Sequence, residues 1–120
     1  MQKVPAQSHR DLVIWRRAIE LCVATYSLTR TFPREEIFGL TSQMRRAGVS
    51  IPSNIAEGYG RLSRVQYRYF LGIAQGSNLE IQTQLEIARR LDLGRSPDLE
   101  NAEALSFEVG KMLTAMLKKL

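Results

Sequence analysis

The chain has 120 residues but only one cysteine, one histidine and no long uninterrupted apolar run. The lone Cys22 cannot form an internal disulfide, which is typical of the reducing cytoplasm. Without a long apolar run, no membrane span or signal peptide is expected. His9 has no second histidine with which to build a catalytic or metal site. We therefore expect a cytoplasmic protein that is not an enzyme, uses no metal or cofactor, and does not bind a membrane.

Acidic residues are also fewer than basic ones. The sequence has 17 Lys+Arg against 12 Asp+Glu, a formal net charge of +5, and 13 of the cations are arginine. Arginine binds phosphate through two parallel hydrogen bonds, so an arginine-rich basic chain is a candidate for binding a polyanion. An ordinary solvated surface with salt bridges would explain the same excess. Both interpretations stay open.

The sequence contains no internal repeat and lacks the alternation of apolar and polar residues that is typical of β-strands. Helical periodicity extends through it instead. Between Ser8 and Thr29, residues recur at intervals of three and four in two adjacent stripes: Leu12, Trp15, Ile19, Cys22 and Tyr26, and Ile14, Ala18, Leu21, Thr25 and Leu28. The two stripes together are wider than the face that a lone bundle covers. Trp15 or Ile14 would then stay partly exposed, which favours self-association.

A second helix is expected to open at Pro33, because proline fits the first helical position. Its periodic pattern continues past Pro52, whose ring collides with the carbonyl group of residue 48. Residue 48 is a glycine, which yields to such a distortion. The pattern therefore predicts one bent helix, which ends at Gly58 and Gly60.

Two further helices complete the prediction. Ser63 and Gln66 form a capping box for the third helix, which Gly94 ends. Two glycines inside it favour a tightly packed neighbour: Gly72 and Gly76. Ser96 and Pro97 begin the fourth helix as its N-cap and first residue. The predicted fold is all-α, an antiparallel up-down four-helix bundle in one domain over residues 8–120, with a flexible tail at residues 1–7.

Cations gather at the start of the third helix. Arg64 and Arg68 are four residues apart and share one helical face, Arg61 precedes them, and Tyr67 lies beside them. The N-terminus of a helix attracts anions, and arginine next to tyrosine can hold phosphates while a base stacks on the ring. These four residues are the candidate nucleic-acid site, and the first helix adds two more: Arg16 and Arg17. A solvated basic face is the alternative.

A second polar cluster is predicted to be structural. Arg45, Arg46, Asn54 and Glu57 lie on the second helix, and Glu80 lies at a similar level on the third. A charge partly inside a bundle costs several kcal/mol unless it is paired. We therefore expect the arginines to pair with Glu57 or Glu80 and to fix which helices pack together. A site for a polyanion or a partner is the alternative.

Five strings resemble the four-helix-bundle proteins encoded in intervening sequences of bacterial 23S ribosomal RNA genes: Asp11–Trp15, Phe32–Glu36, Leu40–Ala47, Ser50–Gly58 and Tyr69–Ala74. The resemblance implies a cyclic homopentamer, often without an established activity. A related branch, the accessory protein of diversity-generating retroelements, binds a reverse transcriptase and nucleic acid. The resulting hypothesis is a non-enzymatic homopentamer that binds RNA or DNA. The alternative is a scaffold that docks a partner enzyme such as a reverse transcriptase.

Overall fold

Helices account for most of the chain in the computed structural model, which describes residues 8–120. The four long helices are α1 (Val13–Thr29), α2 (Ser42–Gly60), α3 (Arg64–Arg90) and α4 (Ser96–Lys119). Short helical turns precede α1 and α2: η1 (His9–Asp11), η2 (Arg34–Glu36) and η3 (Ile37–Thr41). Residues 8–120 contain no strand, so the predicted all-α fold is confirmed. The predicted tail at residues 1–7 lies outside the described residues.

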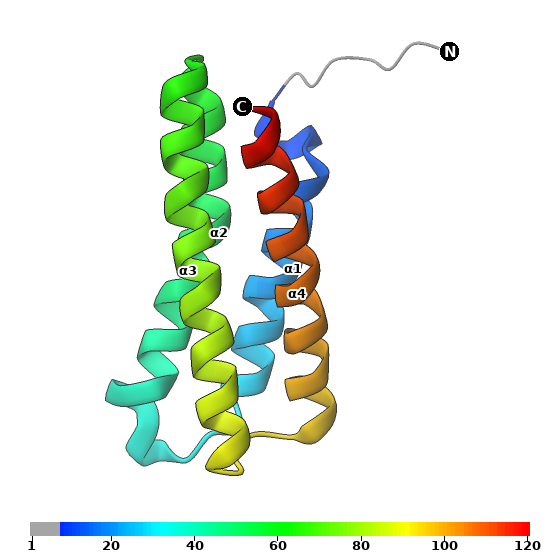
Figure 1. Ribbon diagram of the computed structural model, residues 1–120. Coiled ribbons are helices and arrows are strands. Elements are labelled where there is room, and N and C mark those ends of the chain that lie inside the picture. Colours follow the sequence, from blue (N-terminus) through cyan, green and yellow to red (C-terminus); the bar gives the residue numbers. More distant parts are fainter. Residues whose placement is uncertain (1–7) are drawn as a thin grey trace.

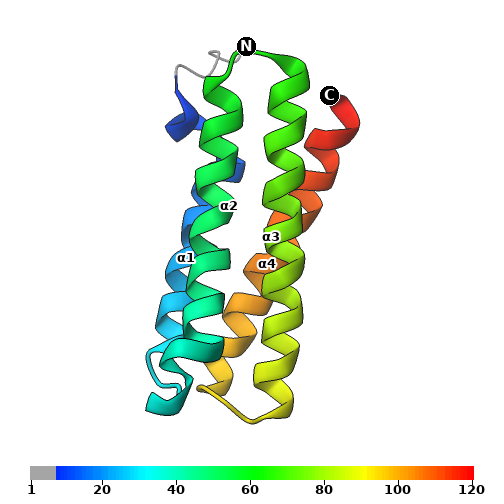
Figure 2. The same ribbon diagram turned by 90° about the vertical axis from the view of Figure 1, so that its left-hand side faces the viewer.

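The helices lie side by side along a molecule with extents of 47 × 29 × 21 Å. In Figure 1 the chain runs down α1, up α2, down α3 and up α4. Helix α1 packs against α2 and α4 and lies diagonally opposite α3. The start of α1, the α2–α3 connection and the end of α4 share one end of the molecule, called the upper end below (Figures 1 and 2). None of the helices in the described range is both long and apolar enough to cross a membrane.

The broad apolar surface of α1 is covered largely by the same chain. The stripe from Ile14 to Leu28 is buried in the core. In the adjacent stripe, the ring of Trp15 packs edge-on to His9 at 5.0 Å. The guanidinium carbon of Arg45 lies 4.6 Å from the centre of the Tyr26 ring. The two stripes therefore do not by themselves require another subunit.

The prediction that the second helix opens at Pro33 is wrong. Pro33 precedes a single 3₁₀ turn, and a π-helical turn follows before the regular α-helix begins at Ser42. Gly39 causes the break, since its φ of −109° and ψ of −114° lie outside the helical region. The Glu36 side chain accepts a hydrogen bond from the Leu40 amide at 3.2 Å and so replaces a lost helical bond. As expected, α2 then continues through Pro52.

Gly48 lies where α2 crosses α1, one turn before Pro52. A methyl group at this position would lie 3.6 Å from Cys22 Cα and from Thr25 Cβ, which is ordinary van der Waals contact. We expect Gly48→Ala to raise the free energy of unfolding by about 0.5–1 kcal/mol, because alanine loses less backbone entropy on forming a helix. Urea denaturation measures this change. A fall in stability would contradict it.

The start of α3 follows the prediction, and that of α4 differs by one residue. Ser63 caps α3, and its hydroxyl accepts from the Gln66 amide at 3.3 Å. Arg95 rather than Ser96 takes the N-cap position of α4. The prediction that another part of the chain packs tightly against Gly72 and Gly76 is wrong. A methyl group at either glycine would meet nothing within 4 Å.

A layer of small polar side chains crosses the middle of the bundle. Asn54 donates to the carbonyl oxygen of Ser50 at 2.8 Å, and the Ser50 hydroxyl lies 2.8 Å from that of Ser77. The buried Asn78 donates to the Ser106 carbonyl at 3.0 Å, and the Ser106 hydroxyl donates back to Asn78 Oδ1 at 2.8 Å. These bonds join α2 to α3 and α3 to α4 at fixed levels.

The predicted ion pairs of the polar cluster do not form. Arg45 donates to the Thr29 hydroxyl at 2.9 Å instead of meeting a carboxylate. Glu57 pairs with Arg61, one turn along the same helix. Arg46 and Glu80 are exposed on the surface. Arg45 thus joins α2 to α1 through a hydroxyl group, and hydroxyl and amide groups rather than ion pairs make the contacts of the polar layer.

Candidate nucleic-acid interface

The net positive charge lies in the half of the molecule next to the upper end. This upper half comprises residues 8–20, 52–76 and 109–120. Its acidic residues are Asp11, Glu20 and Glu57. Its cations are Arg10, Arg16, Arg17, Arg61, Arg64, Arg68, Lys111, Lys118 and Lys119. In the other half the two signs nearly balance, so the molecule has one distinctly basic end.

The three arginines near the α2–α3 connection differ in their surroundings. Arg61 pairs with Glu57 at 3.1 Å and stacks on Phe70 at 5.3 Å. Arg68 donates to the Leu117 carbonyl group near the end of α4. Arg64 is exposed and forms no ion pair within the described chain. Arg64 is therefore the one of the three whose guanidinium group stays fully available to a ligand.

Tyr67 packs inside this turn rather than projecting from it. Its ring lies 6.1 Å from that of Tyr59 in an edge-on arrangement. Gly58 makes the room, since a methyl group there would lie 3.1 Å from Tyr67 Cδ1 and 2.8 Å from Phe70 Cβ. Burial, with a smaller effect of Tyr59, raises the pKa of the Tyr67 hydroxyl. A ring held in this way offers little face for a base to stack on.

The first helix brings its two candidate arginines to the same end, but neither is wholly free. Arg17 pairs with Glu20 at 2.8 Å and with Glu108 at 3.1 Å. The hydrogen bond to Glu20, followed by the charge of Glu108, raises the pKa of Arg17. Arg16 donates to the Asp11 carbonyl at 3.2 Å and is otherwise exposed.

The structure adds residues to the site that the sequence pattern did not indicate. Arg10 lies 5.7 Å over the half-buried ring of Trp15, so an aromatic ring and a cation meet at the upper end. Lys118 and Lys119 are exposed at the end of α4, beside the start of α3. Lys118 and Lys119 are far from Arg10 and Arg64 in the sequence, and only the return of α4 brings them to the same end of the molecule. For the cation beside an aromatic ring on the first helix, the only local signal is that Trp15 is next to Arg16 in the sequence.

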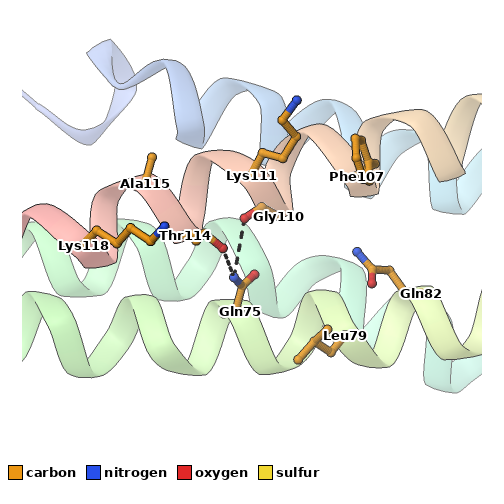
Figure 3. Close-up of a pocket in the computed structure, with 9 residues that line it drawn as sticks. All are labelled: Gln75, Leu79, Gln82, Phe107, Gly110, Lys111, Thr114, Ala115 and Lys118. Atoms are coloured by element: carbon orange, nitrogen blue, oxygen red, sulfur yellow. Dashed lines mark hydrogen bonds between the residues drawn. The ribbon is translucent and has the colours of Figure 1, made fainter.

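A groove of about 530 Å³ runs between α3 and α4 toward the basic end (Figure 3). Gln75 spans it by donating to Thr114 at 2.9 Å and to the Gly110 carbonyl at 3.5 Å. The amino nitrogen of Lys111 lies 5.3 Å over the Phe107 ring. The groove thus combines exposed apolar walls with cations. Among residues 8–120 no group of three His, Cys, Asp or Glu side chains is placed to hold a metal.

The helices and their charges define a small four-helix protein with one basic end and an apolar groove beside it. The model of the 23S rRNA-intervening sequence protein family matches residues 10–115, and the chain therefore belongs to that family. It is similar to a protein of unknown function from the S23 ribosomal protein family of Bacteroides thetaiotaomicron. That crystal structure shares 27% identity with a TM-score of 0.80, over 88% of this chain and 96% of the other. Among curated proteins, none matches the chain.

Proposed function

We propose that this chain is a non-enzymatic cytoplasmic protein that forms a cyclic homopentamer and binds RNA or DNA through its upper end. The separation of charge between the two halves of the molecule is the observation that carries the proposal. Phosphates bind through several cations at once, and the upper half presents exposed ones on α3 and α4. Five copies would carry a total charge of about +25, which gives a strong, salt-dependent attraction to a polyanion.

Neutralising the exposed cations of the upper half tests this function. We expect the triple variant Arg64→Gln, Lys118→Gln, Lys119→Gln to lose about 10–100-fold in affinity for a single-stranded RNA at 0.1 M salt. The dependence of log affinity on log salt should become shallower by about 2, because three fewer phosphate contacts release fewer counterions. Titrations of fluorescent RNA at several salt concentrations measure both quantities.

The matched control removes the same charge from the lower half: Arg30→Gln, Arg34→Gln, Arg95→Gln. All three residues are exposed. We expect this control to change affinity less than threefold. An equal loss of affinity in both variants would show that only net charge matters. If the wild-type chain formed no complex with RNA at micromolar concentration, that result would refute nucleic-acid binding. The alternative, a scaffold for an enzyme such as a reverse transcriptase, predicts a partner that stays bound after nuclease treatment.

A further inference from the structure

The connection between α2 and α3 exposes apolar side chains at the basic upper end of the molecule. Leu62 is 91% exposed, and Val65, in the first turn of α3, is 78% exposed. We call these two side chains the apolar tip. In Figures 1 and 2 the connection that carries them extends beyond the end of α4. A ligand that approaches the upper end along the helices therefore meets the apolar tip first.

The backbone of Leu62 distinguishes it from the single exposed leucines that are common on protein surfaces. Among residues 8–120, two residues other than glycine have a positive φ: Leu62 at 58° and Asp92 at 56°. Aspartate tolerates this left-handed region, whereas leucine is strained there. Glycine usually takes such a position after a helix. A strained and exposed leucine gives the free protein no stability, which indicates that its side chain serves a contact with a ligand.

Hydrogen bonds on both sides of Leu62 hold it in this position. Its amide donates to the Tyr59 carbonyl group at 3.5 Å, in the last turn of α2. The next residue, Ser63, caps α3 by accepting from the Gln66 amide at 3.3 Å, and its carbonyl group accepts from the Tyr67 amide at 2.8 Å. The leucine is therefore presented on an ordered turn, so that little conformational freedom is lost when it binds a ligand.

Cations next to the apolar tip indicate the chemistry of that ligand. Arg61 directly precedes Leu62, and the exposed Arg64 follows it two residues later. Lys118 and Lys119 are exposed at the end of α4, beside the start of α3. A nucleic acid offers a partner to both kinds of group, because its phosphates attract cations and the faces of its bases form apolar contacts. Leucine is one of the side chains that proteins insert between neighbouring bases.

The shape of the upper end favours a single strand over a duplex. Two helices side by side, each about 10 Å across, make the hairpin of α2 and α3 about 20 Å wide. The grooves of B-DNA are about 6 and 12 Å wide and about 8 Å deep, so a leucine on this hairpin cannot reach the stacked bases inside them. Duplex RNA has a major groove that is too narrow, and its minor groove exposes the edges of the bases rather than their faces. In a single strand the faces of the bases are open to contact.

We infer that Leu62 inserts between two neighbouring bases of a single-stranded nucleic acid while Arg64 and Lys118 hold its phosphates. The inference rests on the nucleic-acid binding proposed above, and it adds the class of nucleic acid and the residue that contacts the bases. Cations alone would favour a duplex, because its charge density is higher. A preference for single strands therefore has to come from the apolar tip.

Leu62→Gly tests the inference without changing the charge. The variant should be at least as stable as the wild type, because glycine adopts a positive φ without strain. We expect its affinity for a single-stranded RNA to fall about tenfold at 0.1 M salt, because the buried contact of one leucine side chain is lost. The dependence of log affinity on log salt should stay the same, since no phosphate contact is removed. Affinity for a duplex of the same sequence should change less than about twofold.

A short single strand with 2-aminopurine at its centre reports the insertion directly, because the fluorescence of this base rises when it is unstacked. The wild-type chain should raise the fluorescence, and Leu62→Gly should not. Leu62→Met should behave like the wild type, because methionine is also inserted between bases. The matched control is Phe38→Ser, which removes a 97% exposed apolar side chain from the other half of the molecule. It should change neither the affinity nor the fluorescence.

Equal affinity of the wild type and Leu62→Gly for the single strand would overturn the role of Leu62 while leaving nucleic-acid binding intact. Tighter binding of the wild type to the duplex than to the single strand would overturn the class of ligand. A wild-type chain that binds neither form would refute the proposed function itself. Vesicles of anionic lipid test the competing ligand, since an apolar tip among cations also suits a membrane surface. Vesicle binding that depends on Leu62, together with RNA binding that does not, would overturn the inference in favour of a membrane.

Discussion

Gly94→Ala is expected to lower the free energy of unfolding by about 2–4 kcal/mol. Gly94 joins α3 to α4 with a φ of +78°, a backbone conformation that costs alanine about 1–2 kcal/mol. A methyl group there would also lie 2.5 Å from Leu28 Cδ1 and 3.0 Å from Phe32 Cε1. Leu28 lies in the last turn of α1 and Phe32 follows that helix, and both side chains are buried, so they cannot move aside without disturbing the core.

Urea denaturation followed by circular dichroism measures this loss. Gly60→Ala is the matched control, because a methyl group at position 60 meets nothing within 4 Å. We expect the control to leave stability unchanged or slightly higher. If Gly94→Ala were as stable as the wild type, the connection between α3 and α4 could not have the tight packing described above.

Asn78→Leu should cost about 2–3 kcal/mol, although leucine is apolar and similar in size. Asn78 and Ser106 are both fully buried and exchange two hydrogen bonds between α3 and α4. The leucine would leave the Ser106 hydroxyl without its acceptor, and a buried polar group without a partner costs about 1–3 kcal/mol. Gly110 leaves little room for a larger group, since a methyl group there would lie 3.1 Å from Asn78 Nδ2.

A double-mutant cycle separates these contributions. Asn78→Leu combined with Ser106→Ala should recover at least half of the lost stability, because neither side chain then has an unmet hydrogen bond. Urea denaturation of the wild type, both single variants and the double variant supplies the four free energies. Strictly additive losses would contradict a mutual hydrogen-bonded pair.

The helices could be predicted because their signals are local. Periodic apolar residues and the cap at Ser63 act within one or two turns, and tertiary contacts did not override them. The start of α2 could not be predicted in the same way. There the conformation of Gly39 and the reach of Glu36 decide where α-helix begins, and neither has a clear sequence signature. Glycine spacing on α3 likewise indicated a close neighbour, but both glycines face open space within the chain.

The candidate site was predictable only where its residues are near in sequence. Spacing placed Arg64 and Arg68 on one face of α3, but it could not show that Arg68 donates to a carbonyl group of α4. Lys118 joins the site because α4 returns to the upper end, which is a property of the whole fold. Asn54 was expected to be structural and does belong to the polar layer, but the pair of Asn78 and Ser106 was missed for the same reason, since these two residues are 28 positions apart.

The uneven charge along a body 47 Å long gives each subunit a permanent electric dipole directed along its longest axis. Such a dipole turns a molecule during diffusion, so that it approaches a polyanion with the basic end first. Orientation before contact raises the rate of productive encounters. Added salt weakens this effect, because at 0.1 M the field is largely screened beyond about 10 Å from the surface. Encounter with a long phosphate backbone would then begin end-on, before any side chain has formed a specific bond.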